Sequence, residues 1–114
     1  MASARLRPLA ESDLLERTAH YRDQGGSDLA ERFFDSAIAA LRAIEHMPEA
    51  GSPRIAELCD IEGLRVGRIR RFPCAWFYFV RATHIDVVRL LALTRDLPAV
   101  LADLDDDEPP GMMN

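Results

Sequence analysis

The sequence predicts one α+β domain in which an N-terminal strand precedes an antiparallel helical hairpin, a three-stranded antiparallel meander and a short C-terminal helix. Two stretches with helical patterns follow each other in the first half of the chain, separated by Gly25 and Gly26. Three stretches rich in β-branched and aromatic residues occupy much of the second half. A chain of 114 residues is long enough for one hydrophobic core and too short for two.

The first half of the chain predicts the strand and the hairpin. Residues 4–10, ARLRPLA, alternate in a way that indicates a short edge strand, where proline is tolerated. Ser12 is expected to cap a first helix that ends at the two glycines, and Ser27 begins a second helix that Pro48 and Gly51 close. Apolar residues of the second helix fall at steps of three and four, namely Ala30, Phe33, Phe34, Ala37, Ile38, Leu41 and Ile44. So short a connection forces the two helices to fold back on each other.

The second half of the chain predicts the meander. Its strands are expected within residues 64–72, 74–82 and 84–93, separated by Pro73 and by Thr83-His84. The middle stretch has apolar residues on both faces, with Trp76, Tyr78 and Val80 against Phe77 and Phe79. Because side chains alternate along a strand, we expect this stretch to be the central strand. Residues 94–104 then predict a turn and a short helix.

Charge is distributed unevenly along the chain. The segment from 103 to 114 holds five of the nineteen acids, Asp103, Asp105, Asp106, Asp107 and Glu108, and we expect it to be a disordered tail after a domain of residues 1–102. Seven arginines and one acid, Asp86, lie between Leu64 and Arg95. The chain has no lysine, and arginine binds carboxylate or phosphate through two parallel hydrogen bonds. The arginine-rich part therefore indicates a surface for phosphate or for an acidic partner peptide.

Signals for most enzymatic chemistry are missing. The chain has no phosphate-binding glycine loop, no histidine pair at metal-binding spacing and no nucleophile elbow, so we expect no catalytic residue, metal or cofactor. Cys59 and Cys74 lack metal-like spacing and are expected to be unpaired thiols. No apolar run is long enough to cross a membrane, and the N-terminus has no secretory pattern. A cytoplasmic protein that makes no membrane contact is the expectation.

Three segments carry specific local motifs, namely EGLR at 62–65, RRFPCAWFYFV at 70–80 and IDVVRLLALTRDLPAVL at 85–101. They resemble motifs of the RelE/ParE superfamily of bacterial type II toxins, and in particular of its ParE branch, also called plasmid-stabilisation proteins. The helical segment AERFFDSAIAALRAIEHMPEAGSP at 30–53 is similar in pattern. The resemblance covers about residues 4 to 101 and implies the RelE/ParE-like fold.

The resemblance implies a toxin that binds and inhibits DNA gyrase and is neutralised by a cognate antitoxin, ParD-like or similar, in a hetero-oligomer. Operator DNA would be reached only through the antitoxin. For the antitoxin we expect an acidic segment that orders on binding and contacts Arg65, Arg68, Arg70, Arg71 and Arg81. The gyrase contact is placed at Arg89, Arg95 and Asp96.

Two other functions stay open at this point. RelE relatives cut mRNA on the ribosome, but the basic segment offers only Tyr78 and His84 for proton transfer, which makes a binding inhibitor the favoured interpretation. ParE relatives usually carry Arg after the Phe-Tyr pair and His before Arg-Asp, whereas this chain has Phe79 and Ala92. These departures raise the possibility of a degenerate toxin retained as an antitoxin-binding co-repressor.

Overall fold

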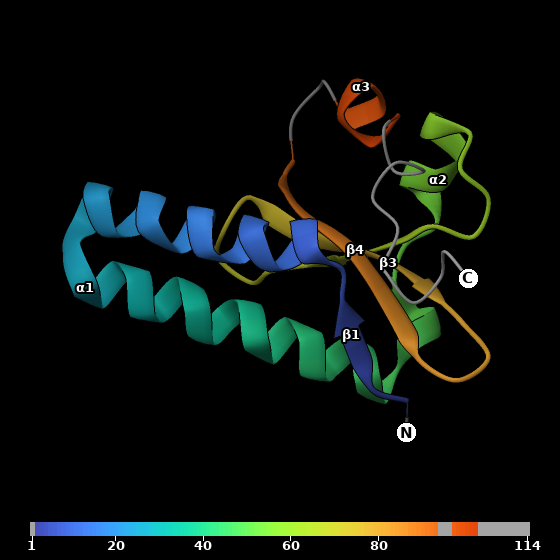
Figure 1. Ribbon diagram of the computed structural model, residues 1–114, viewed down its shortest axis with the longest axis horizontal. Helices are drawn as coiled ribbons and strands as arrows, with labels where there is room; N and C mark the ends of the chain where they lie inside the picture. The colour runs from blue at the N-terminus through green and yellow to red at the C-terminus, as the bar shows by residue number, and fades with distance from the viewer. Residues whose placement is uncertain (1, 94–96, 103–114) are drawn as a thin grey trace.

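A mixed four-stranded sheet forms the centre of the structure. We used a computed structural model, which describes residues 2–93 and 97–102. The strands lie in the order β1 (Ala4–Leu6), β4 (Ile85–Ala92), β3 (Cys74–Val80) and β2 (Arg65–Arg68). β2, β3 and β4 form the expected antiparallel meander, and β1 pairs in parallel with β4 at the edge (Figure 1). The predicted α+β class is confirmed.

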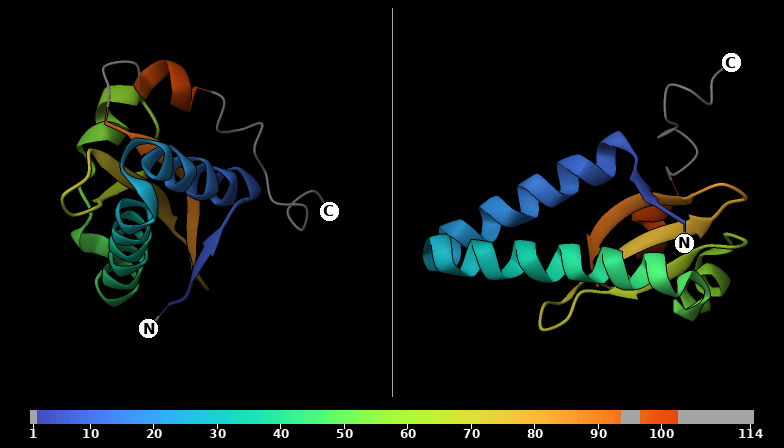
Figure 2. Two further views of the ribbon diagram at one scale, coloured as in Figure 1. Left: turned by 90° about the vertical axis from the view of Figure 1, so that its left-hand side faces the viewer. Right: turned by 90° about the horizontal axis from the view of Figure 1, so that it is seen from below.

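The helical hairpin is present as one long element, α1 (Pro8–His46), that reverses at Gly26. Gly26 has φ +82°, a conformation that strains any residue with a Cβ atom, and the helix direction changes there. The two arms, residues 8–25 and 27–46, run back along each other (Figures 1 and 2). The second arm ends one residue before Met47, close to the stop predicted at Pro48.

The start of the first helix differs from the prediction. β1 ends at Leu6, and α1 begins at Pro8 rather than after a cap at Ser12. Proline suits the first helical turn, because its missing N–H has no acceptor there in any case. The N–H of Arg7 donates to the Val87 carbonyl at 2.9 Å, so strand pairing continues up to the residue before the helix.

β3 is buried on both of its faces. Trp76 and Tyr78 pack with Phe33, Ala37 and Ile44 of α1 in one core. On the opposite face, Ala75 and Phe77 pack in a second core with Ala56, Leu64, Val66, Val88, Leu97 and Leu101. The second core lies under two short helices, α2 (Arg54–Cys59) and α3 (Leu97–Leu101), which contact each other at one end of the molecule (Figure 1). The expected central strand is therefore confirmed.

The first meander strand is shorter than predicted, and α2 was not predicted at all. Of residues 64–72, only Arg65–Arg68 form β2, whereas Arg70 and Arg71 lie in the turn to β3. The Ile69 N–H donates to the Cys74 carbonyl at 2.9 Å, and Arg71 has φ +72°. This tight reversal ends the two-residue alternation, so Arg70 and Arg71 do not continue the strand faces on which Arg68 and Arg65 lie.

Gly51 lies where the segment after α1 passes over the edge of the core. This segment contains a short 3₁₀ helix, η1 (Pro48–Ala50), whose Pro48 carbonyl accepts a hydrogen bond from the Tyr78 hydroxyl at 2.5 Å. A Cβ atom on Gly51 would overlap that hydroxyl and approach the Tyr78 ring carbon Cζ to 2.9 Å.

We therefore expect Gly51→Ala to destabilise the fold by about 1–3 kcal/mol, the usual cost of overpacking a well-packed site. Urea unfolding measures the change. In a Tyr78→Phe background the same substitution should cost less, because the overlapping oxygen is gone. An equal cost in both backgrounds would contradict the proposed overlap.

Candidate partner-binding site

The five arginines predicted to bind an antitoxin do not form one cluster. Arg68, Arg70 and Arg71 surround the β2–β3 turn, where they line a shallow depression with Ile69, Phe72, Pro73 and Leu93. Arg81 follows the other end of β3, in the turn to β4. Arg68 pairs with Ala75, so about six residues of extended strand, roughly 20 Å, separate it from Arg81 along β3. The predicted set therefore divides between opposite ends of the sheet.

Arg65 has a structural role. Its guanidinium Nη1 donates to the Glu49 carbonyl at 2.9 Å and to the Gly51 carbonyl at 2.7 Å. Both acceptors belong to the segment that connects α1 to α2. Arg65 thus fastens this connection to the start of β2, and a partner would have to break these bonds to use its donors.

A groove lies between the second arm of α1, the connection after it and β2. It has a volume of about 490 Å³, and its lining includes Ala43, Ile44, Met47, Gly51, Arg54, Val66, Arg68 and Tyr78. Most of these side chains are apolar, while the two arginines supply positive charge, and Met47 is exposed. An amphipathic segment with acidic residues along one side would suit such a groove. Arg68 and Tyr78 are recognisable from the sequence, but the groove is not, because its lining comes from three segments that are distant in the chain.

Tyr78 is held as a neutral phenol at the base of this groove. Its side chain is fully buried, and its hydroxyl donates to the Pro48 carbonyl. Burial raises the pKa of Tyr78, and the nearby Arg65 charge and a hydrogen bond with the Gly51 backbone offset that rise only in part. A buried phenol that stays protonated and already donates its proton is poorly placed to act as a general base.

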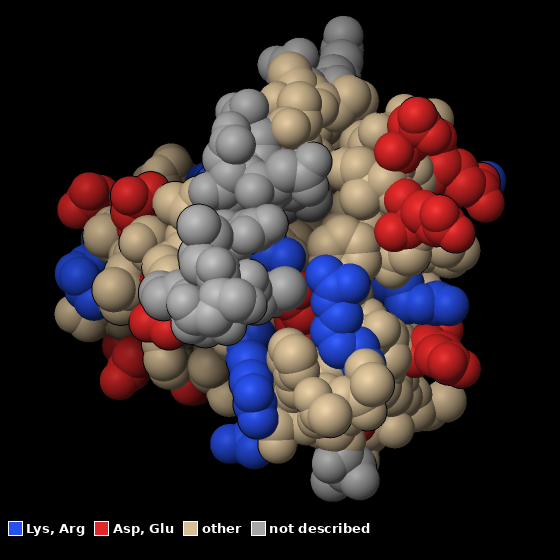
Figure 3. Space-filling view, turned by 45° about the vertical axis from the view of Figure 1, so that its right-hand side comes forward, with Lys and Arg blue, Asp and Glu red and all other residues tan. Residues whose placement is uncertain are grey.

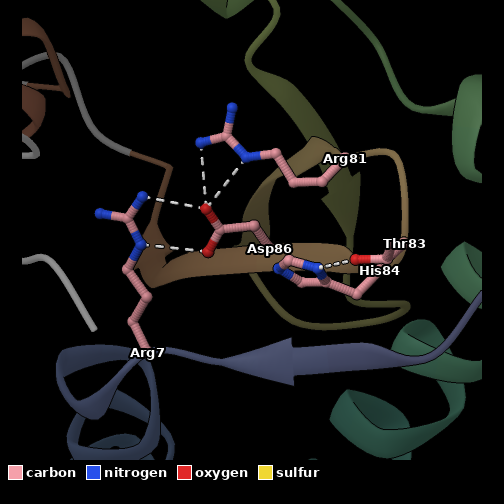
Figure 4. A network of polar contacts seen from close by, with 5 residues as sticks. All are labelled: Arg7, Arg81, Thr83, His84 and Asp86. Atoms are coloured by element: carbon pink, nitrogen blue, oxygen red, sulfur yellow. Dashed lines mark hydrogen bonds and ion pairs between the residues drawn. The ribbon is translucent and has the colours of Figure 1, made fainter. Parts of the chain in front are cut away.

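An ion-pair network that the sequence analysis did not predict joins β1 to the β3–β4 turn (Figure 4). Asp86 accepts bonds from Arg7 Nε and Nη2 at 3.1 and 3.0 Å and from Arg81 Nε and Nη2 at 3.3 and 3.1 Å. Asp86 and Arg7 are buried, whereas 41% of the Arg81 side chain is exposed. We call these three residues the Asp86 network.

The Asp86 carboxylate keeps its charge inside the protein because of this network. Burial raises the pKa of Asp86, but the hydrogen bonds and charges of Arg7 and then Arg81 outweigh it, so the pKa lies below its ordinary value. Only tertiary contact reveals the network, since Arg7 and Asp86 are 79 positions apart in the chain.

The residues predicted to contact gyrase are only partly described by the structure. Arg89 donates from Nε and Nη2 to the Asp13 carboxylate at 2.7 and 3.0 Å, and Asp13 also accepts from the Leu90 N–H at 3.0 Å. Asp13 therefore binds the edge of β4 beyond the end of β1. Arg95 and Asp96 lie outside the described residues, as does the acidic segment 103–114.

The two departures from the ParE pattern have clear structural surroundings. The Phe79 ring lies under the Arg81 guanidinium, whose central carbon is 4.5 Å from the ring centroid, and Phe79 packs against the second core. Ala92 pairs with Cys74 at the end of β4 and is half-buried. Phe79 thus supports the orientation of Arg81.

Charges of both signs occur on the face that Figure 3 shows, so the arginines do not form one continuous basic surface there. Among residues 2–93 and 97–102, no group of three or more His, Cys, Asp or Glu side chains is arranged to hold a metal ion. None of the helices in this part of the chain is long and apolar enough to cross a membrane. Cys59 and Cys74 are unpaired thiols.

The fold is similar to that of a solved structure, the "Chromosomal ParDE TA system from P. aeruginosa". The two align with a TM-score of 0.71 and 19% sequence identity over 82% of this chain and 98% of that chain. The family model for the ParE toxin of type II toxin-antitoxin systems (parDE) matches residues 4–97. The chain belongs to this ParE toxin family. No curated protein sequence matches it significantly.

The Asp86 network predicts a pH dependence of stability. The pKa of Asp86 is lower in the native protein than in the unfolded chain, so the unfolded chain binds a proton first as the pH falls. The contribution of Asp86 to the free energy of unfolding is therefore complete above about pH 4 and is lost as the pH falls through the native pKa. Asp86→Asn removes the buried carboxylate that accepts four hydrogen bonds from Arg7 and Arg81 and should cost about 3–5 kcal/mol at neutral pH. Urea unfolding across the acidic range measures both effects.

The exposed Glu57 provides a control, because Glu57→Gln removes a carboxylate that lies at the protein surface. This variant should keep the acid-dependent loss of the native protein, whereas Asp86→Asn should reduce it. The same pH slope in all three proteins would contradict the assignment to Asp86.

Proposed function

We propose that this protein is the toxin of a type II toxin-antitoxin pair and that it binds and inhibits DNA gyrase. The observation that carries the proposal is the ParE family match over residues 4–97, which spans all of the described strands and both arms of α1. Inhibition by binding needs no catalytic group of the toxin. The buried, hydrogen-bonded Tyr78 favours this mechanism over mRNA cleavage, since it was one of only two candidates for proton transfer.

Neutralisation by an antitoxin is the second part of the proposal. The similar P. aeruginosa structure is that of a ParDE system, which supports a partner of the ParD kind. We assign an acidic antitoxin segment to the groove beside Tyr78 and to the arginines of the β2–β3 turn, with Arg81 as a separate contact at the far end of β3. Apolar side chains of the segment would enter the groove while its carboxylates meet the guanidinium groups.

Replacing Arg68, Arg70 and Arg71 together by alanine should weaken antitoxin binding by about 30-fold, if each exposed ion pair contributes roughly 0.7 kcal/mol. Isothermal titration with the antitoxin encoded beside this chain measures the change. A control variant with alanine at Arg5, Arg22 and Arg32 removes the same amount of charge from other exposed positions and should bind the antitoxin like the native chain. If both triple variants bind like the native chain, or lose affinity equally, the turn is not the contact.

Expression of the chain without its antitoxin should arrest growth, and the purified protein should inhibit gyrase supercoiling and accumulate cleaved DNA complexes. Arg95→Ala should reduce that inhibition, whereas Arg32→Ala on the exposed side of α1 should not. Because Arg89 binds Asp13, an Arg89 variant is informative only if its unfolding free energy is unchanged. Growth arrest with active gyrase and cleaved mRNA would favour a ribonuclease. Normal growth would favour the degenerate toxin retained as a co-repressor, the hypothesis that Phe79 and Ala92 motivate.

A further inference from the structure

The turn between β2 and β3 carries three exposed arginines, Arg68, Arg70 and Arg71. Within residues 2–93 and 97–102, their guanidinium groups form no ion pair and no hydrogen bond. The chain from 63 to 85 contains no Asp or Glu. The negative charge that balances this turn therefore comes from outside the described fold.

Arg71 occupies a backbone conformation that glycine normally supplies. The Phe72 N–H donates to the Ile69 carbonyl at 3.3 Å, so residues 69–72 form a four-residue turn with Arg71 in its third position. Arg71 has φ +72°, a left-handed conformation that is strained for a residue with a Cβ atom and that Gly or Asn usually adopts at this position. An arginine at a strained position, without a structural contact for its charge, points to a use of its side chain in binding.

The rest of the turn is anchored in the body of the protein. The Phe72 ring packs edge-on against the rings of Tyr21 and Phe33, with centroid distances of 4.9 and 5.2 Å. The Leu93 N–H donates to the Pro73 carbonyl at 2.9 Å, which fastens the end of β4 to the turn. Figure 2 shows the turn, coloured yellow-green, extending away from the strands in its right-hand view. The arginines are thus presented to solvent from a fixed base.

The spacing of these charges distinguishes between polyanions. Three guanidinium groups are attached to residues 68–71, whose Cα atoms span at most about 11 Å. The phosphates of one DNA strand follow each other about every 3.4 Å along the helix axis, and both strands together carry one charge per about 1.7 Å. In an extended acidic peptide, residues that point to the same side lie about 7 Å apart. Duplex DNA therefore matches the density of charge at this turn better than a peptide does, and each arginine can bind phosphate through two parallel hydrogen bonds.

We propose that the β2–β3 turn binds the phosphate backbone of duplex DNA through Arg68, Arg70 and Arg71. Contacts with phosphate carry no sequence information, so this binding is independent of base sequence. The biological setting rests on the proposed function: the duplex is then the DNA that gyrase holds, and the turn adds a contact with DNA to the contact with the enzyme. The antitoxin segment assigned to the same arginines excludes DNA from the turn, which links neutralisation to the loss of this contact.

The test measures binding of the full-length chain to a fluorescently labelled DNA duplex of mixed sequence, without gyrase or antitoxin. Three phosphate contacts should give a slope of about −2.7 for the logarithm of the binding constant against the logarithm of the salt concentration. This slope corresponds to a loss of affinity of about 40-fold between about 50 and 200 mM salt. Fluorescence anisotropy measures both quantities. Alanine at Arg68, Arg70 and Arg71 together should remove the salt-dependent binding.

Two further variants separate binding from folding. Arg71→Gly removes one charge and relieves the strained backbone, so it should reduce the salt slope by about 0.9 while the urea midpoint of unfolding stays the same or rises. The exposed arginines elsewhere provide the matched control, because alanine at Arg5, Arg22 and Arg32 removes the same amount of charge and should leave the slope as in the native chain.

Absence of DNA binding by the native chain at about 50 mM salt, where electrostatic contacts with phosphate are strong, would overturn the proposal. Equal losses of affinity in the two triple alanine variants would also overturn it, as would tighter binding of a single-stranded RNA of the same sequence. The outcome is independent of the proposed function, because gyrase is absent. A native chain that inhibits gyrase supercoiling but does not bind DNA would leave that function intact and remove only the DNA contact.

Discussion

The burial of β3 on both faces is the constraint on which the rest of the structure depends. Five consecutive residues, Cys74 to Tyr78, are excluded from water, although side chains on a strand point alternately to opposite sides. Two separate covers are therefore required. α1 covers one face, and α2 with α3 covers the other. β2 and β4 form the backbone hydrogen bonds along the two edges of the strand.

Two polar side-chain atoms of β3 determine the position of α1 and of the segment after it over the sheet. The Trp76 indole N–H donates to the Ala37 carbonyl at 2.9 Å, and the Tyr78 hydroxyl donates to the Pro48 carbonyl. Burying either donor without an acceptor would be costly, so α1 and the segment after it are held at a defined height over the sheet. The groove proposed for the antitoxin arises at this junction, and Arg65 stabilises its rim.

The structure also separates the arginines by role. Arg7, Arg65 and Arg89 bind groups of the protein itself, so their charges are already used in folding. Arg68, Arg70 and Arg71 are exposed around the β2–β3 turn, and Arg81 combines an internal bond with an exposed surface. We therefore propose the turn and Arg81 as the contacts for an acidic partner. A count of arginines along the sequence does not make this distinction, because it contains no information on where carboxylates and carbonyls from other segments lie.

Local patterns in the sequence determined the elements whose causes are local. The apolar spacing of residues 30–44, the two glycines at 25 and 26 and the aromatic run at 76–79 predicted the hairpin and the central strand. The pairing of β1 with β4, the Asp86 network and the groove depend on residues tens of positions apart, and no local pattern encodes them. Pro8 and the turn at Arg71 were misjudged for the same reason, since strand pairing decided where β1 and β2 end. The sequence by itself determined the helical hairpin, the central strand and the family, and only the tertiary structure decided which charged side chains are already bound to groups of the protein itself.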